Sequence, residues 1–124
     1  MATWSSDELT RIAAAEEVRI AALRTDGTLR KPVIVWIVRA GDELYVRSVK
    51  GRNAAWFRGV QVRHEGSLQA AGVNKEVDFV EVVDTDQHEV DAAYRSKYAR
   101  YPSIVPSVLT PETRTTTLRL VPRD

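Results

Sequence analysis

The chain has 124 residues, with 18 Lys and Arg against 17 Asp and Glu, and it has no cysteine. A net charge of +1 gives no reason to expect a nucleic-acid or membrane partner, and the lack of cysteine excludes disulfides and thiolate chemistry. No apolar run has the length of a membrane span or the pattern of a signal peptide, so we expect one cytoplasmic domain over residues 1–124.

The first elements are a capped helix, a strand and a tight turn. Ser5 and Glu8 have the spacing of a capping box, which predicts a helix near 6–16. Alternating apolar residues predict a strand near 18–24. Asp26-Gly27 follows directly and is a strong signal for a hairpin turn.

A second hairpin follows in the next part of the chain. Residues 28–39 predict a second strand and residues 44–49 a third, with turn residues at 40–43. The second strand includes Val33–Val38, an unbroken apolar run rich in β-branched residues. Such a run is typical of a strand that is covered on both faces.

The rest of the chain predicts two more helices and three more strands. The elements are a helix at 53–60, strands near 67–70 and 76–83, a helix at 86–100 capped by Thr85, a proline-rich loop at 102–112 and a closing strand at 115–121. About six mostly antiparallel strands with about three helices predict an α+β, mainly β fold. So many short strands favour a barrel or a strongly curled sheet.

A cluster of polar and basic residues follows the third strand. Arg47, Ser48, Lys50, Arg52 and Asn53 lead into the predicted helix. Cations and free amides at a helix N-terminus can hold a phosphate. The alternative is that this cluster is a solvated loop and helix face.

Other candidate groups are less informative. Trp36 and Trp56 could stack on a flat ring, although a tryptophan inside an apolar run is commonly a core residue. His64 and His88 have no companions at metal-ligand spacing, so we expect no metal. No nucleophile with a neighbouring base is evident, and catalytic residues stay unassigned.

The order of three motifs resembles a known group of proteins. They are Asp26–Arg30, Leu44–Ser48 and Ala92–Tyr98. These three motifs resemble a domain-of-unknown-function family related to the FMN-binding split β-barrel superfamily. The order of the first helix, the Asp26-Gly27 turn, the apolar strand, the strand that ends at Ser48 and the basic loop resembles that superfamily as a whole, which includes pyridoxamine-phosphate-oxidase-like proteins and deazaflavin-dependent nitroreductases.

The resemblance implies a split β-barrel that binds FMN or a deazaflavin coenzyme at the interface of a homodimer. The ring would lie along the strand at 32–36, and the phosphate would be held by the basic loop. The implied cofactor-binding residues are Val33, Val35, Trp36, Arg47, Ser48, Lys50, Arg52, Asn53 and Trp56. The implied activity is that of an oxidoreductase acting on a small molecule. No nucleic acid or membrane is an expected partner.

Two other functions stay open. The family pattern has a proline after the position of Asn53, where this chain has Ala54. That departure favours a non-catalytic split-barrel module with an empty pocket or another small ligand. A curved-sheet cone fold holding an apolar ligand is the third possibility.

Overall fold

We describe a computed structural model of the chain, which defines residues 3–83 and 87–123. Helix α1 (Ser6–Ala14) begins at the predicted capping box, because Ser5 accepts a hydrogen bond from the N–H of Glu8 and Glu8 accepts one from the N–H of Ser5. The helix ends slightly before residue 16, since Ala15 already has an extended backbone that leads into the first strand. The capping box is therefore confirmed.

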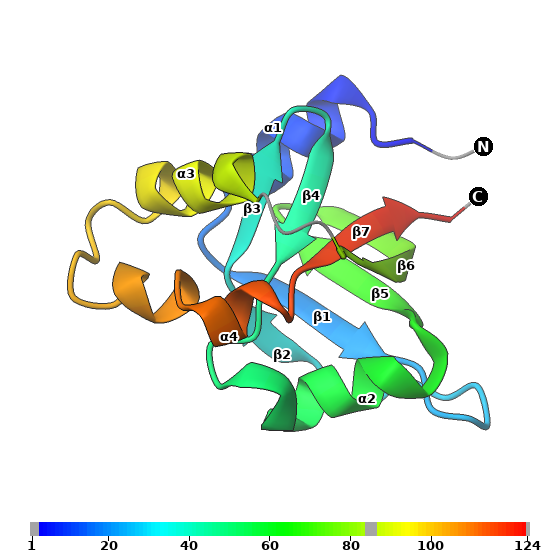
Figure 1. Cartoon of the computed structure of the whole chain (residues 1–124). Helices are drawn as coiled ribbons and strands as arrows, with labels where there is room; N and C mark the ends of the chain where they lie inside the picture. Colours follow the sequence, from blue (N-terminus) through cyan, green and yellow to red (C-terminus); the bar gives the residue numbers. More distant parts are fainter. Residues whose placement is uncertain (1–2, 84–86, 124) are drawn as a thin grey trace.

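The seven strands of the described chain form one antiparallel sheet that curls round on itself (Figure 1). They are β1 (Val18–Ala22), β2 (Val33–Val35), β3 (Ile37–Ala40), β4 (Glu43–Val46), β5 (Glu65–Ala70), β6 (Val73–Glu81) and β7 (Leu118–Pro122). Their order in the sheet is β2-β1-β5-β6-β7-β4-β3. The two outermost strands, β2 and β3, are separated in the sequence only by Trp36, so the chain itself closes the barrel at this seam.

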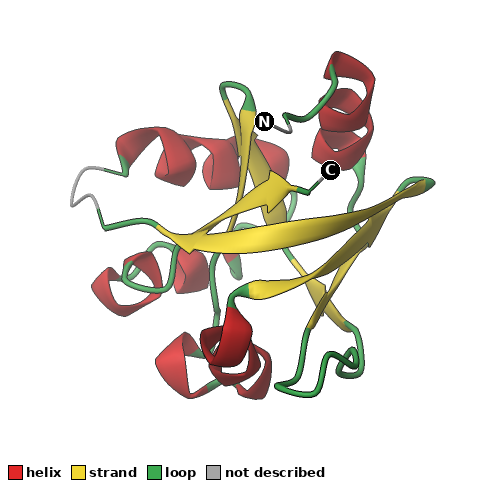
Figure 2. Ribbon diagram, turned by 90° about the vertical axis from the view of Figure 1, so that its right-hand side faces the viewer, coloured by secondary structure: helices red, strands yellow, loops and turns green. Residues whose placement is uncertain are grey.

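The predicted count of about six strands is corrected to seven, because the predicted strand at 28–39 is divided. Its first strand segment, β2, pairs with β1, whereas its second, β3, pairs with β4. The chain leaves one edge of the sheet and joins the other at Trp36. The barrel-like, mostly antiparallel architecture that the sequence predicts is confirmed (Figure 2).

The turn between β1 and β2 forms at Asp26-Gly27, as predicted. Gly27 has a φ of +87°, which glycine adopts without strain. The carboxylate of Asp26 accepts a hydrogen bond from the N–H of Thr28 at 3.0 Å. Regular pairing does not continue directly from this turn, since a single bridge joins Leu23 to Leu29 before β2 begins.

The barrel interior is filled by alternate residues of the strands. Buried side chains that meet there include Val18, Ile20, Val35, Ile37, Leu44, Val46, Leu68, Val77, Phe79, Leu118 and Leu120. At one point the backbones approach so closely that a side chain does not fit. A Cβ on Gly66 would lie 2.1 Å from the carbonyl oxygen of Ala21, so β1 and β5 can pair there only around a glycine.

Helices cover the outside of the barrel, with α3 and α4 on one side and α2 beneath β1 and β2 (Figure 1). They are α2 (Ala55–Arg63), α3 (His88–Lys97) and α4 (Pro111–Arg114), with 3-10 turns η1 (Gly51–Asn53) and η2 (Val105–Val108). The predicted helices at 53–60 and 86–100 are thus present with shifted ends, and the loop at 102–112 contains η2 and part of α4. The predicted cap Thr85 lies outside the described residues. No helix of the described chain is long and apolar enough to cross a membrane.

Candidate functional site

A pocket of about 450 Å³ lies at the seam of the barrel, where β2 passes the start of α2. We call it the seam pocket. Its lining consists of Val33, Ile34, Val35, Trp36, Arg47, Val49, Lys50, Ala54, Ala55, Trp56 and Ile104. Six of the nine residues that the resemblance implies are therefore brought together: Val33, Val35, Trp36, Arg47, Lys50 and Trp56.

Trp36 is held at the seam by aromatic residues of the α3 region. Its ring stacks on Tyr98, with centroids 4.0 Å apart and an interplanar angle of 6°. The ring of Tyr101 approaches at 5.6 Å, and the hydroxyl of Tyr94 donates a hydrogen bond to the carbonyl of Trp36 at 2.9 Å. Trp36 is consequently both a packing residue and part of the pocket wall.

The side chain of Lys97 helps to hold α3 against the barrel. Its ammonium group donates to the carbonyl oxygens of Ile37, at 2.7 Å, and Ile12, at 3.3 Å. Burial disfavours the charged form and lowers the pKa of Lys97 to about 8. Burial also raises the pKa of Tyr94 and Tyr98, so both hydroxyls keep their protons and act as donors.

Trp56 lies in the first turn of α2 and also lines the seam pocket. The N-cap residue, Ala54, makes no side-chain cap hydrogen bond, and the first turn contains no acidic residue. The N-terminal amides of α2 therefore meet no anionic side chain of that turn.

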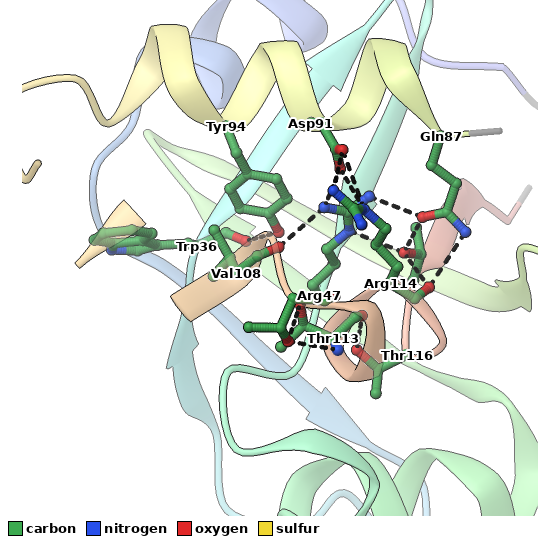
Figure 3. Close-up of polar contacts among 11 residues, drawn as sticks. Trp36, Arg47, Gln87, Asp91, Tyr94, Val108, Thr113, Arg114 and Thr116 are labelled. Atoms are coloured by element: carbon green, nitrogen blue, oxygen red, sulfur yellow. Dashed lines mark hydrogen bonds and ion pairs between the residues drawn. The ribbon is translucent and has the colours of Figure 1, made fainter. Parts of the chain in front are cut away.

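The guanidinium of Arg47 does not point into a free phosphate site (Figure 3). Its side chain is fully buried and donates four hydrogen bonds, to Asp91 at 2.6 Å, Gln87 at 2.8 Å, Thr117 at 3.0 Å and the carbonyl of Val108 at 3.0 Å. These partners lie on and around α3, η2 and the start of β7. Arg47 thus ties the outer helices to the end of β4.

Asp91 is shared between two arginines. Besides the contact with Arg47, it accepts hydrogen bonds from Nη2 of Arg114 at 2.8 Å and from Nε at 3.1 Å. Burial acts to raise the pKa of Asp91, but the hydrogen bonds from Arg114 and Arg47 outweigh burial and hold that pKa below its ordinary value. The carboxylate is therefore charged inside the fold.

Lys50 lines the seam pocket, whereas three other predicted phosphate ligands, Ser48, Arg52 and Asn53, do not. The hydroxyl of buried Ser48 donates to the carbonyl of Gly51 at 2.6 Å. Arg52 donates to the carbonyl of Thr115 at 3.0 Å and lies over the ring of Phe57. Asn53 is exposed in η1. That Ser48, Arg52 and Asn53 hold a phosphate stays a prediction, but the structure does not gather them around one cavity.

A second pocket, of about 230 Å³, adjoins the seam pocket near the β1–β2 turn. We call it the hairpin pocket. It is lined by Ile20, Ala22, Arg24, Arg30, Lys31, Val33, Ala55, Trp56 and Val60. No motif in the sequence marks its three cations as binding residues. The available signal was the pair Arg30-Lys31 placed directly before the apolar run that becomes β2.

The family model described as "Uncharacterized protein conserved in bacteria (DUF2255)" matches residues 8–120. A search of curated proteins found no match. Several solved structures share the fold at low sequence identity, and the three reported next have TM-scores between 0.53 and 0.61.

The names of the similar structures mention different ligands. An F420-H2-dependent reductase (FDR-A) is 14% identical, has a TM-score of 0.61 and aligns over 85% of this chain and 92% of its own. The heme storage protein HutZ from Vibrio cholerae is 10% identical, with a TM-score of 0.59 over 95% and 88%. An FAD-binding protein from Mesorhizobium loti is 17% identical, with a TM-score of 0.53 over 97% and 89%. The likeness is one of fold, and the ligand has to be argued from the site.

Proposed function

The chain belongs to the DUF2255 family, and we propose that it binds a flavin or a deazaflavin coenzyme in the seam pocket as an oxidoreductase-like protein. The names of two similar structures, an F420-H2-dependent reductase and an FAD-binding protein, support a ligand of this class. The substrate is a small molecule of unassigned chemistry.

One observation carries this proposal: the seam pocket combines an open strand edge with two tryptophans. β2 is the last strand in the sheet order, so one of its backbone edges has no strand partner. Its N–H and C=O groups can bond the polar edge of a flat heterocycle. Trp36 and Trp56 add aromatic faces, and a volume near 450 Å³ falls in the range of small-ligand pockets, roughly 300–1,000 Å³.

The residues around the seam pocket serve to bind, orient and exclude water. A bound flavin or deazaflavin would supply the hydride-transfer chemistry itself. Among the described residues that line this pocket, none is a carboxylate or a histidine, so we assign no catalytic acid or base to the chain. Val33 and Val35 form the apolar floor, and Lys50 is an exposed cation at the rim.

We further propose that a second copy of the chain covers the seam pocket in a homodimer. Three exposed aliphatic side chains belong to its lining, with exposed fractions of 59% for Ile34, 48% for Val49 and 47% for Ile104. A partner over this face would bury them and shield the ligand from water. Light scattering on the purified protein is expected to give twice the mass of one chain.

The proposal is tested by titrating the purified protein with FMN and with the deazaflavin coenzyme, and following absorbance and fluorescence. Trp56→Ala is expected to weaken binding about three- to ten-fold, because an aromatic stacking contact contributes about 0.5–1.5 kcal/mol. Val62→Ala is the matched control, since Val62 is an exposed apolar residue of the same helix that does not line the pocket.

If the parent protein binds neither cofactor at high micromolar concentration, the oxidoreductase proposal is wrong. The non-catalytic small-ligand module would then be the better description. One observation favours it: the donors of Arg47 and Ser48, which the resemblance implies for a phosphate, are bonded within the protein.

A further inference from the structure

We infer that the hairpin pocket is the subsite for the phosphate-bearing chain of the cofactor, with Arg30 and Lys31 as its main ligands. This inference rests on the proposed function, because it places the anionic part of the same ligand whose ring lies in the seam pocket. It moves the phosphate away from the loop at 47–53, where the sequence predicts it.

The two pockets share a wall, so one ligand can extend through both. Val33, Ala55 and Trp56 line the seam pocket and the hairpin pocket alike. When the cofactor ring lies beside Trp36 and Trp56, its flexible phosphate-bearing chain can therefore pass Trp56 and reach the β1–β2 turn. The path runs along the N-terminal turn of α2, which carries no acidic residue.

The hairpin pocket is cationic, and its charges are not neutralised by its lining. Arg24, Arg30 and Lys31 line it, and none of its described lining residues is acidic. Within the part of the chain that the structure describes, Arg30 and Lys31 have no side-chain hydrogen bond and no ion pair. Arg24 differs, since its guanidinium donates to the hydroxyl of Thr28 and the carbonyl of Leu29.

Elsewhere on the surface, charges occur largely in pairs. Examples are Arg11 with Asp7 at 3.1 Å and Lys75 with Glu8 at 2.9 Å. Among its described lining residues the hairpin pocket gathers three cations and no carboxylate, whereas the seam pocket gathers two cations, of which Arg47 is bonded within the protein. Uncompensated cations in a concave site attract an anion.

Arg30 is also held in place by the fold. Its backbone N–H donates to the carbonyl of Ala22 at 2.8 Å. Its side chain lies against α2 so closely that a Cβ on Gly59 would be 2.8 Å from Nε of Arg30. Because Gly59 has no side chain, the side chain of Arg30 can pass across α2 at this point. The close contact restricts the positions that the guanidinium can take.

In the loop predicted to hold the phosphate, Lys50 is exposed, but both guanidinium groups already donate to the protein. The guanidinium of Arg47 is buried against Asp91 and three further acceptors, and that of Arg52 donates to Thr115. A phosphate dianion is recognised by charge-assisted hydrogen bonds from donors that have no other partner. Arg30 and Lys31 meet that condition better than Arg47 does.

The test compares FMN with riboflavin, which carries the same ring without the phosphate, by fluorescence titration of five proteins. The parent is expected to prefer FMN. Arg30→Gln and Lys31→Gln are each expected to weaken FMN binding about ten-fold, the effect of one charge-assisted hydrogen bond, and to leave riboflavin binding unchanged. Arg58→Gln removes an exposed cation of α2 that lines neither the hairpin pocket nor the seam pocket, and it is the matched control. Arg52→Gln removes the cation that the sequence predicts.

The possible outcomes separate this inference from the proposed function. If the parent binds FMN and riboflavin equally, or if Arg30→Gln and Lys31→Gln keep its preference for FMN, the subsite is wrong while the ring site stands. A loss of FMN affinity in Arg52→Gln alone would overturn the subsite and return the phosphate to the loop. If the parent binds neither flavin and also fails to bind the deazaflavin coenzyme, the ring site and the subsite are both refuted.

Discussion

Arg47 and Arg30 both line pockets beside β2, but among the described residues Arg47 has an acidic partner and Arg30 has none. The guanidinium of Arg47 is surrounded by four acceptors, among them the carboxylate of Asp91. That of Arg30 lies on α2 next to Gly59 and has no acceptor among the described residues. An arginine whose donors are bonded within the protein stabilises the fold, whereas one without partners is available to a ligand.

The same comparison explains where the resemblance transfers and where it does not. The apolar wall at Val33 and Val35 and the two tryptophans gather at one pocket. Of the polar and basic residues after β4, Lys50 is an exposed residue of that pocket, whereas the donors of Arg47 and Ser48 are bonded within the protein. A motif at the right place in the chain can therefore have a structural role when the surrounding helices supply acceptors.

The largest effect that we expect concerns the buried arginine. Arg47→Met keeps the apolar stem but leaves Asp91, Gln87 and the carbonyl of Val108 without this donor, and it is expected to lower the free energy of unfolding by about 3–5 kcal/mol. Urea denaturation measures the change. Arg52→Met is the matched comparison, because an exposed arginine with one backbone contact should contribute less than about 1 kcal/mol. Equal stabilities of the two variants would contradict the role of Arg47 as the link between barrel and helices.

The second expected effect is a loss of folding stability at low pH. The pKa of Asp91 is lower in the folded chain than its ordinary value of 3.8, so the charged carboxylate stabilises the fold above about pH 4. That contribution is lost as the pH falls through the lowered pKa. Asp91→Asn is expected to be less stable than the parent by about 1–3 kcal/mol at neutral pH, and the difference should shrink below pH 4. Chemical denaturation from pH 7 to pH 3 measures it, and a constant difference would contradict the assignment.

The smallest expected effect concerns Gly59→Ala, which should alter ligand binding by Arg30 without lowering the stability of the fold. Gly59→Ala places a methyl group where the side chain of Arg30 lies and should displace the guanidinium without removing its charge. Because alanine is a better helix former than glycine, the variant should be as stable as the parent or more stable by up to about 1 kcal/mol. Its preference for FMN over riboflavin should fall. Thermal melting and the flavin titration test both parts, and an unchanged preference would show that the position of Arg30 does not matter.

Local sequence signals predicted much of the fold. The capping box at Ser5 and Glu8 and the Asp26-Gly27 turn depend on residues within four positions of each other, and both form as predicted. Val90, Tyr94 and Tyr98 have the spacing of one helix face, and they pack together with Val38 of β3. These features need no knowledge of distant parts of the chain.

The division of the strand at 28–39 could not be predicted in this way. Val33–Val38 is uniformly apolar, and nothing within it indicates a break at Trp36. The break follows from pairing, since β2 joins β1 while β3 joins β4. Partners of this kind depend on how the whole sheet closes.

The roles of the arginines were likewise decided by tertiary structure. By itself, the sequence determined the capped first helix, the turns, the apolar strands and the presence of basic residues on both sides of the apolar run, because these depend on side-chain chemistry and short-range spacing. Only the fold brought Asp91 next to Arg47, 44 positions away in the chain, and placed Arg30 against Gly59 with no acidic partner among the described residues. Whether a cation is neutralised or free depends on which groups folding places within a few ångströms of it, and that is a property of the packed chain rather than of its local sequence.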